Sequence, residues 1–290
     1  TLAALAIPEV MGYTKIAGMP VITGLYTILL PLLVFALLGS SRHLVVGADS
    51  ATAAIMAAGL AGLAASGSSQ YVALAGMLAI LTAAMLLLAR LARLGFLADF
   101  LSRTVLIGFL TGVGIQVGCE QVAGMLGVTG EKGGPLTQLV GALGEIGSAN
   151  TDTVLVSVGV LAFLVLGPRL SKAVPWALLA VVGAIAASKG LDLAAHGVAT
   201  LGTVPSGLPS LGWPSVSSSD LPELIGTAAS IFIVVLAQSA ATSRAYAAKF
   251  GDRFDENVDL VGLSAASLSA GVSGTFVVNG SPTKTAMVDS

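Results

Sequence analysis

The stretch VVNGSPTKTAMV, residues 277–288, decides the fold, because small turn-forming residues there precede a new apolar helix. A second stretch, VVGADSATAAIM at residues 45–56, repeats the order of its features: two valines, a glycine, small hydroxylated residues and an apolar helix containing threonine. Gly, Pro and Ser at such positions end one helix and start another. Weak internal similarity of this kind predicts an inverted repeat, in which two halves of the chain cross the membrane in opposite directions.

The composition predicts an integral membrane protein. Of the 290 residues, 55% are hydrophobic and only 10% are charged, and the mean hydropathy is +0.95. A soluble domain carries about 25% charged residues. The net charge of −2 argues against a nucleic-acid partner. The single cysteine, Cys119, excludes a disulfide framework, and no His or Cys cluster or nucleophile–base pair indicates a metal, a cofactor, catalytic residues or an enzyme.

About ten apolar segments approach the 20 residues that a bilayer crossing requires. They are residues 1–14, 20–38, 49–64, 71–89, 104–126, 153–168, 173–189, 222–243, 256–273 and 281 onward. We expect interruptions at Pro8, at residues 47–52 and at residues 279–283, and an exposed linker at 127–152. The first segment has no charged leader, so we interpret it as a helix and not a signal peptide. We expect the sequence to be a fragment of a larger membrane protein.

The basic residues predict the orientation of these segments. If the first segment runs from inside to outside, nine of the thirteen Lys and Arg residues fall in inner connections. These are Arg42, Arg90, Arg93, Arg103, Arg169, Lys172, Arg244, Lys249 and Arg253. Inner loops carry an excess of Lys and Arg, so a cytoplasmic N-terminus in a plasma (inner) membrane is predicted.

The two interrupted helices also predict an anion site. A helix that starts inside the membrane presents unpaired N–H groups and the positive end of its dipole, and two such starts facing each other favour a bound anion. Lys284 lies in the first turn of one of them. A lysine within the membrane costs roughly 2.5–3.5 kcal/mol, which a bound anion would offset. The alternative is a structural ion pair of Lys284 with Glu9 or Asp49.

Three stretches resemble the sulfate permease (SulP) family. They are IPEVMGYTKIAGMPVITGLYTILLPLLVFALLGSSRHLVVGADSA at 7–51, FLSRTVLIGFLTGVGIQVGCEQVAGMLGV at 100–128 and DENVDLVGLSAASLSAGVSGTFVVNGSPTKTAMVDS at 255–290. The resemblance implies an all-α membrane protein with the seven-plus-seven inverted-repeat fold of uracil permease. About helices 1–10 would be present, with helices 3 and 10 broken.

The resemblance further implies a core domain that slides as an elevator against a gate domain. On this sequence, residues 1–103 would hold core helices 1–4, residues 104–189 gate helices 5–7, residues 190–221 an extracellular connection, and residues 222–290 core helices 8–10, truncated. Family members usually form homodimers and carry a cytoplasmic STAS domain after helix 14.

The family's substrate site lies between the starts of helices 3 and 10, with side chains from helices 1 and 8. The matching candidates are Lys284, Thr283, Ser281, Gly280, Asp49, Ser50, Ala48, Glu9, Tyr13 and Gln238. Lys284 stands where the family usually has Arg, Glu9 where it has Gln, and Gln238 where many members have Glu. Glu9 and Asp49 are therefore candidates for proton coupling, because protonation removes the repulsion between a carboxylate and an anion. Alternatively, each carboxylate pairs with Lys284 or caps a helix.

The function that follows is secondary active transport of a small inorganic anion, such as a sulfate-like oxyanion, bicarbonate or chloride, with proton symport left open. An organic substrate such as a dicarboxylate is the first alternative. A channel-like anion conductor is the second, and the sequence does not separate these.

Overall fold

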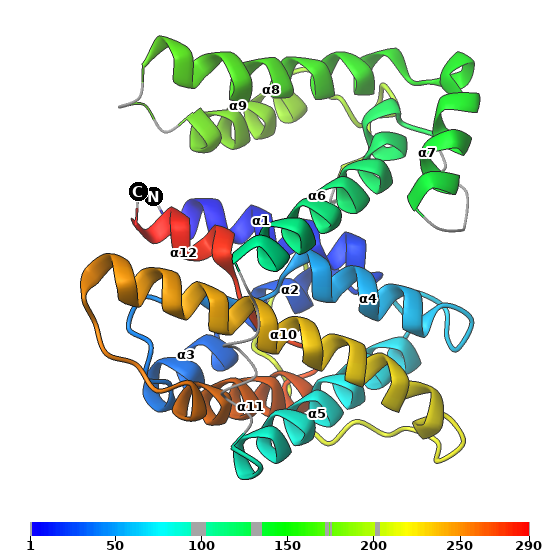
Figure 1. Cartoon of the computed structure of the whole chain (residues 1–290). Helices are drawn as coiled ribbons and strands as arrows, with labels where there is room; N and C mark the ends of the chain where they lie inside the picture. The colour runs from blue at the N-terminus through cyan, green and yellow to red at the C-terminus, as the bar shows by residue number, and fades with distance from the viewer. Residues whose placement is uncertain are drawn as a thin grey trace. The chain divides into compact units, whose positions relative to one another are not determined.

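The computed structural model describes residues 2–93, 103–128, 135–171, 174, 176–200 and 204–289. Most of these residues are helical, and they form one two-stranded sheet (Figure 1). The elements are α1 (Leu2–Ala17), α2 (Val21–Thr27), α3 (Leu30–Leu38), β1 (Val46–Gly47), α4 (Ser50–Leu60), α5 (Ser69–Leu91), α6 (Arg103–Leu126), α7 (Pro135–Gly144), the 3-10 turn η2 (Ile146–Ser148), α8 (Thr151–Leu170), α9 (Trp176–Gly190), α10 (Leu221–Phe250), α11 (Glu256–Val272), β2 (Asn279–Gly280) and α12 (Pro282–Asp289).

The predicted apolar segments correspond to helices in the structure, with two differences in where they break. The second segment is divided into α2 and α3 at residues 28–29. The first is not interrupted, since α1 runs continuously through Pro8. A proline removes only one backbone donor, and transmembrane helices tolerate this loss. Within the described residues, four stretches are long and apolar enough to cross a membrane: Val21–Leu38, Ser69–Leu91, Thr151–Leu170 and Leu221–Phe250.

The prediction of an exposed linker at residues 127–152 is wrong, because this region contains α7 and η2. Pro135 occupies the first helical position, where its missing N–H has no consequence. Leu136, Val140 and Leu143 then follow at spacings of four and three residues and are 71%, 68% and 51% exposed. The segment is thus an amphipathic helix whose apolar face is suited to a lipid interface. Its glycines concealed this periodicity.

The chain forms two compact units. One consists of Thr1–Pro8 and Phe109–Thr203, and the other of Glu9–Gly108 and Val204–Ser290. In the first unit, α8 packs against α9. The indole of Trp176 covers Gly167 of α8, where a Cβ would approach it to 2.4 Å, and its Nε1 donates to the carbonyl of Ser171 at 2.7 Å.

The second unit is built around α11, which packs along α5 and α3, while α10 packs on α5 and α4 (Figure 1). A Cβ on Gly271 of α11 would lie 2.6 Å from the carbonyl oxygen of Gly76 on α5, and a Cβ on Gly76 would lie 2.9 Å from that of Gly271. The two helices therefore approach this closely only because both residues are glycines.

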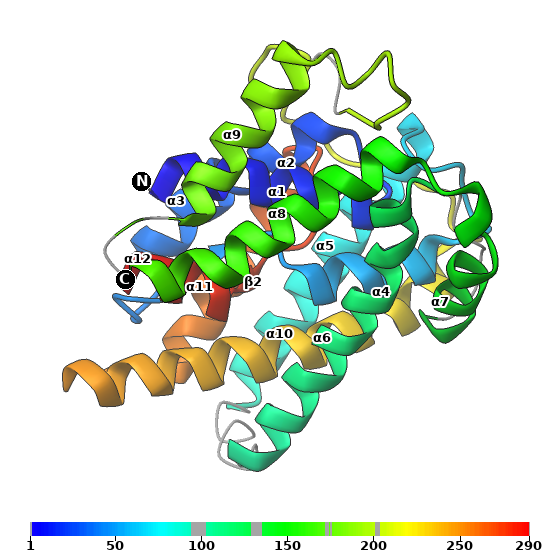
Figure 2. The same cartoon turned by 90° about the horizontal axis from the view of Figure 1, so that it is seen from above.

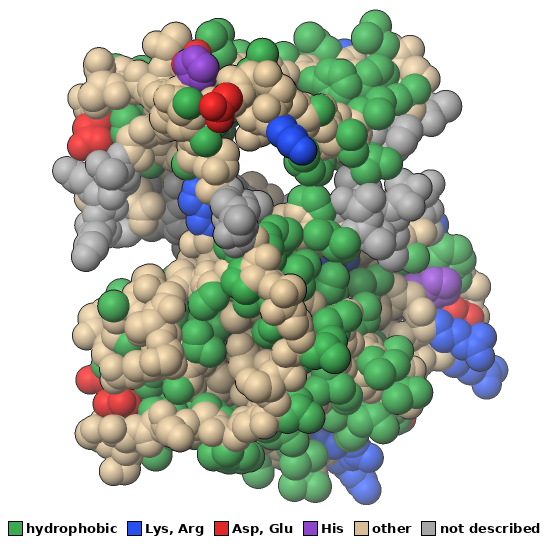
Figure 3. All heavy atoms as spheres, turned by 180° about the vertical axis from the view of Figure 1, so that it is seen from behind, with side chains coloured by type: hydrophobic (Ala, Val, Ile, Leu, Met, Phe, Trp, Pro, Cys, Tyr) green, Lys and Arg blue, Asp and Glu red, His purple; other side chains and the backbone are tan. Residues whose placement is uncertain are grey.

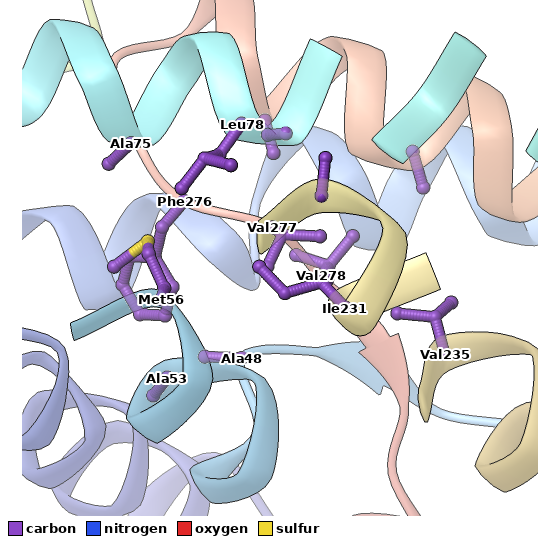
Figure 4. Packing of buried hydrophobic residues seen from close by; sticks show 14 of the residues in the cluster. Ala48, Ala53, Met56, Ala75, Leu78, Ile231, Val235, Phe276, Val277 and Val278 are labelled. Carbon is purple, nitrogen blue, oxygen red and sulfur yellow. The ribbon is translucent and has the colours of Figure 1, made fainter. Parts of the chain in front are cut away.

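The segment that precedes β2 passes through the core of this unit. Phe276, Val277 and Val278 are fully buried. Figure 4 shows them among side chains from α4, α5 and α10, such as Met56, Leu78 and Ile231. Burying side chains of this size stabilises each by about 1.5–3 kcal/mol. This packing fixes the position from which β2 and α12 start.

Candidate functional site

Two short strands place the starts of two helices beside each other. β1 and β2 are antiparallel, with Val46 opposite Gly280 and Gly47 opposite Asn279. β1 leads into α4 and β2 into α12, and both views show the two helices leaving the strands in opposite directions (Figures 1 and 2). Two halves related by an inverted repeat produce this arrangement. The positive ends of two helix dipoles, each equivalent to about half an elementary charge, thus face a common region.

Lys284 extends from the first turn of α12 to the backbone in front of α4. Its side chain is buried, with 1% of the residue exposed. Nζ donates a hydrogen bond to the carbonyl oxygen of Ala48, lies 3.8 Å from Glu9 Oε2 and lies 4.7 Å from the centroid of the Tyr13 ring. The lysine stem passes Gly47, where a Cβ would be 3.7 Å from Lys284 Cε. The ammonium is therefore held by a carbonyl, a carboxylate and an aromatic face.

Glu9 of α1 is the acidic partner in this cluster. Its Oε1 accepts hydrogen bonds from Tyr13 Oη at 2.6 Å and from Thr283 Oγ1 at 3.4 Å. Its Oε2 is buried and has no hydrogen-bond partner among the described residues. A buried carboxylate oxygen without a donor is unfavourable, so this atom is a place for a proton or for a further bound group.

The start of α12 is fixed by hydrogen bonds to the chain before β1. Ser281 donates its N–H to the carbonyl of Val45 at 2.9 Å, and Val45 donates its own N–H to Thr285 Oγ1 at 3.1 Å. The Ser281 hydroxyl accepts from the Lys284 N–H at 3.4 Å and lies 3.0 Å from Thr283 Oγ1. Ser281 is buried, whereas Thr283 is exposed, so Thr283 lies at the open side of the cluster.

The start of α4 contributes the second carboxylate. Asp49 is 6% exposed at the N-cap position, where its side chain makes no capping hydrogen bond, and it interacts electrostatically with Lys284 and Glu9. Ser50, the first residue of α4, is half-buried. One ammonium is thus surrounded by two carboxylates.

Gln238, the remaining predicted residue, belongs to a neighbouring network. Its Oε1 accepts a hydrogen bond from Asn279 Nδ2, and the Asn279 Oδ1 accepts from Ser239 Oγ at 2.9 Å. Ser239 Oγ also accepts the N–H of Gly280 at 3.0 Å. This buried network ties β2 to α10. Gly280 has no room for a side chain, because its Cβ would lie 2.8 Å from Ser239 Oγ. Sequence reasoning missed Asn279 and Ser239, although Asn279 immediately precedes the Gly-Ser pair.

Sequence reasoning also missed Asp259 of α11, which holds the turn that leads into β1. This buried carboxylate accepts hydrogen bonds from the N–H and hydroxyl groups of Ser40 and Ser41, including 2.8 Å and 3.0 Å bonds from the two N–H groups, and from Ser243 Oγ at 3.1 Å. Five donors on one carboxylate form a strong anchor. Because β1 follows within a few residues, Asp259 indirectly positions Ala48.

Comparison with known proteins identifies the family of this chain. A profile of the sulfate permease family matches residues 1–290. The chain belongs to this family. A probable sulfate transporter of Mycobacterium tuberculosis is 37% identical over 289 residues, which cover 100% of this chain and 52% of the relative. Prestin of Danio rerio is 26% identical over 316 residues, covering 98% of this chain and 42% of the relative. The chain spans about half the length of these curated relatives.

Solved structures confirm the fold class. The murine Solute Carrier 26 family member A9 anion transporter, in the inward-facing state, superposes with a TM-score of 0.88 and 22% sequence identity. The match covers 99% of this chain and 51% of the transporter chain. The transmembrane domain of the cyanobacterium bicarbonate transporter BicA matches 99% of this chain and 74% of its own with a TM-score of 0.85 and 22% identity. The predicted uracil-permease-like fold with broken third and tenth helices is thus confirmed, and the family and the apolar helices indicate an integral membrane protein.

Proposed function

We propose that the protein which contains this chain is a secondary active transporter of a small inorganic anion, with its substrate bound between the starts of α4 and α12. The observation that carries this proposal is the buried ammonium of Lys284 at the meeting point of two helix N-termini. Both features favour negative charge. The relatives named as sulfate transporters and the bicarbonate transporter of the same fold support an inorganic oxyanion as the substrate class.

In the proposed bound state, the anion pairs with Lys284 and accepts hydrogen bonds from hydroxyl groups at the open side of the cluster. Thr283 and Tyr13 supply these donors once they release Glu9, which now accepts from both. Glu9 then carries the coupled proton, since protonation cancels its attraction to Lys284 and its repulsion of the anion. The Glu9 Oε2 atom supports this role, because it accepts no hydrogen bond from the described residues. Asp49 is the second proton candidate.

We further propose an elevator mechanism in which the compact unit of residues 9–108 and 204–290 moves as a body. This unit contains every residue of the candidate site, and most of the predicted gate, residues 104–189, belongs to the other unit. The homodimer, the plasma membrane and the cytoplasmic N-terminus stay predictions from the sequence.

The test is uptake by the full-length protein in proteoliposomes. Sulfate, bicarbonate, chloride and a dicarboxylate are offered with and without an inward proton gradient, to the wild type and to Lys284→Ala. Lys15→Ala is the matched control, because Lys15 is exposed at the end of α1. We expect Lys284→Ala alone to lose uptake of one inorganic anion while it remains folded. Unchanged uptake, or uptake of the dicarboxylate only, contradicts the proposal.

A further inference from the structure

Away from the proposed anion site, a shallow recess lies between the turn after α3 and the C-terminal end of α10. We refer to it as the basic recess. It is lined by Arg42 and His43 of the turn, by Tyr246 of α10 and by Asp252, Arg253 and Phe254 of the loop that follows. All of these residues belong to the unit of residues 9–108 and 204–290.

The two arginines of the basic recess have no acidic partner among the described residues. Arg42 and Arg253 are exposed, and neither forms a hydrogen bond or an ion pair with the part of the chain that the structure describes. The acidic residue of the recess, Asp252, is bound by His43 Nε2 at 3.0 Å. Figure 3 shows the molecule from behind, and Lys and Arg side chains gather there beside a histidine and an acidic side chain at the right edge of the view.

The acidic side chains of the adjoining α11 are also engaged. Glu256 Oε1 accepts hydrogen bonds from Arg244 Nε at 2.7 Å and from Arg244 Nη2 at 2.5 Å. The Asp255 side chain caps α11 by accepting hydrogen bonds from the N–H groups of its first turn. Lys249 adds a further positive charge beside the recess, with Nζ 5.3 Å from the ring centroid of Phe250. The recess thus has two guanidinium groups available to an anion from outside the chain.

Exposed apolar side chains lie on the two helices that end at the recess. Leu37 and Leu38, at the end of α3, are 74% and 46% exposed, and Phe250, which stacks on the His43 ring, is 47% exposed. Both helices belong to the stretches that are apolar enough to cross a membrane. Apolar surface with arginines at its edge is typical of a membrane interface. Acyl chains cover the apolar surface there, and lipid headgroups contact the arginines.

We propose that the basic recess binds the headgroup of an anionic phospholipid, with Arg42 and Arg253 donating to its phosphodiester. A guanidinium matches phosphate oxygens with paired N–H donors. The adjacent leucines and Phe250 select a lipid over a free phosphate, because only a lipid also covers that surface. The sequence predicts this end of the helices to be cytoplasmic, where anionic lipids concentrate.

The experiment titrates detergent-solubilised full-length protein with phosphatidylglycerol, phosphatidylcholine or inorganic phosphate and follows the thermal unfolding temperature. We expect phosphatidylglycerol alone to raise this temperature. Each arginine near a membrane surface contributes roughly a fivefold gain in affinity, so Arg42→Gln/Arg253→Gln raises the half-saturating lipid concentration roughly 25-fold. Arg42→Lys/Arg253→Lys recovers part of this loss.

The matched control is Arg90→Gln/Arg93→Asn, which removes two cations from the end of α5, also predicted to be cytoplasmic. This variant retains the wild-type response if the basic recess is the lipid site. An equal loss in both double variants shows a diffuse charge effect and overturns the proposal. If inorganic phosphate raises the unfolding temperature as much as phosphatidylglycerol does, the proposal is overturned as well, because a free anion is then enough to occupy the recess.

Discussion

Replacement of Glu9 by glutamine is expected to strengthen anion binding and to remove its dependence on pH. In the wild type, the Glu9 carboxylate competes with the anion for Lys284, whose Nζ lies 3.8 Å from Oε2. Under the proposal, the form of Glu9 that carries the coupled proton permits anion binding, and the carboxylate form opposes it. A single coupled proton gives up to a tenfold change in affinity per pH unit. Glutamine has nearly the same shape and is neutral throughout.

The size of the effect follows from the distance between the two charges. Two unit charges about 4 Å apart interact by about 4 kcal/mol at the effective dielectric constant typical of proteins. Part of this is lost to reorganisation of the ammonium, which keeps its bond to the Ala48 carbonyl. If only a third of this interaction energy becomes available to the incoming anion, its binding free energy improves by about 1.4 kcal/mol. This corresponds to a tenfold higher affinity at high pH.

The assay is calorimetric titration of the purified full-length protein with sulfate, from about pH 5 to about pH 8. Asp49→Asn is the matched control, since it removes the other carboxylate near Lys284. The reasoning is refuted if Glu9→Gln retains the wild-type slope against pH, or if it weakens anion binding. A slope that disappears in Asp49→Asn instead assigns the proton to Asp49.

Three further predictions concern the support of the site. Asp259→Ala leaves the half-buried N–H groups of Ser40 and Ser41, in the turn after α3, without their acceptor. It is expected to reduce the free energy of unfolding by about 3 kcal/mol, measured by thermal unfolding in detergent. An unchanged unfolding temperature contradicts this. Gly271→Val places side-chain carbon against a carbonyl of α5 and should abolish folded expression, whereas Gly183→Ala, with nothing within 4 Å, should be neutral. Tyr13→Phe keeps the aromatic ring beside the Lys284 ammonium but removes the hydroxyl that donates to Glu9. The anion affinity, measured by calorimetric titration, should therefore change several-fold while the unfolding temperature stays the same.

The sequence was sufficient to predict the long apolar helices, although not α7, and it offered Glu9 as one of two carboxylates near Lys284. Long apolar segments have few alternatives in a membrane, because each backbone polar group must be satisfied inside the segment. The repeated Val-Val-Gly patterns predicted that the segments around Gly47 and Gly280 would meet, and the structure pairs them as β1 and β2. The assignment of substrate binding to this cluster stays a proposal.

The residues that the sequence did not reveal depend on contacts between distant segments. Asp259 resembles any acidic residue near a helix start, and its role emerges only when α3 and α11 pack together. Gln238 was predicted to join the site from the family resemblance, and its hydrogen bond from Asn279 could not be predicted, because it joins residues of α10 and β2 that are 41 positions apart. Its place in a substrate site stays a prediction.

The measurement that tests the central claim most directly is anomalous diffraction from crystals of the full-length protein soaked in selenate, a heavier analogue of sulfate. The account predicts an anomalous peak between the starts of α4 and α12, within hydrogen-bonding distance of Lys284 Nζ, which is lost in Lys284→Ala. A peak elsewhere in the membrane-spanning region, or one that persists at the same place in Lys284→Ala, contradicts it.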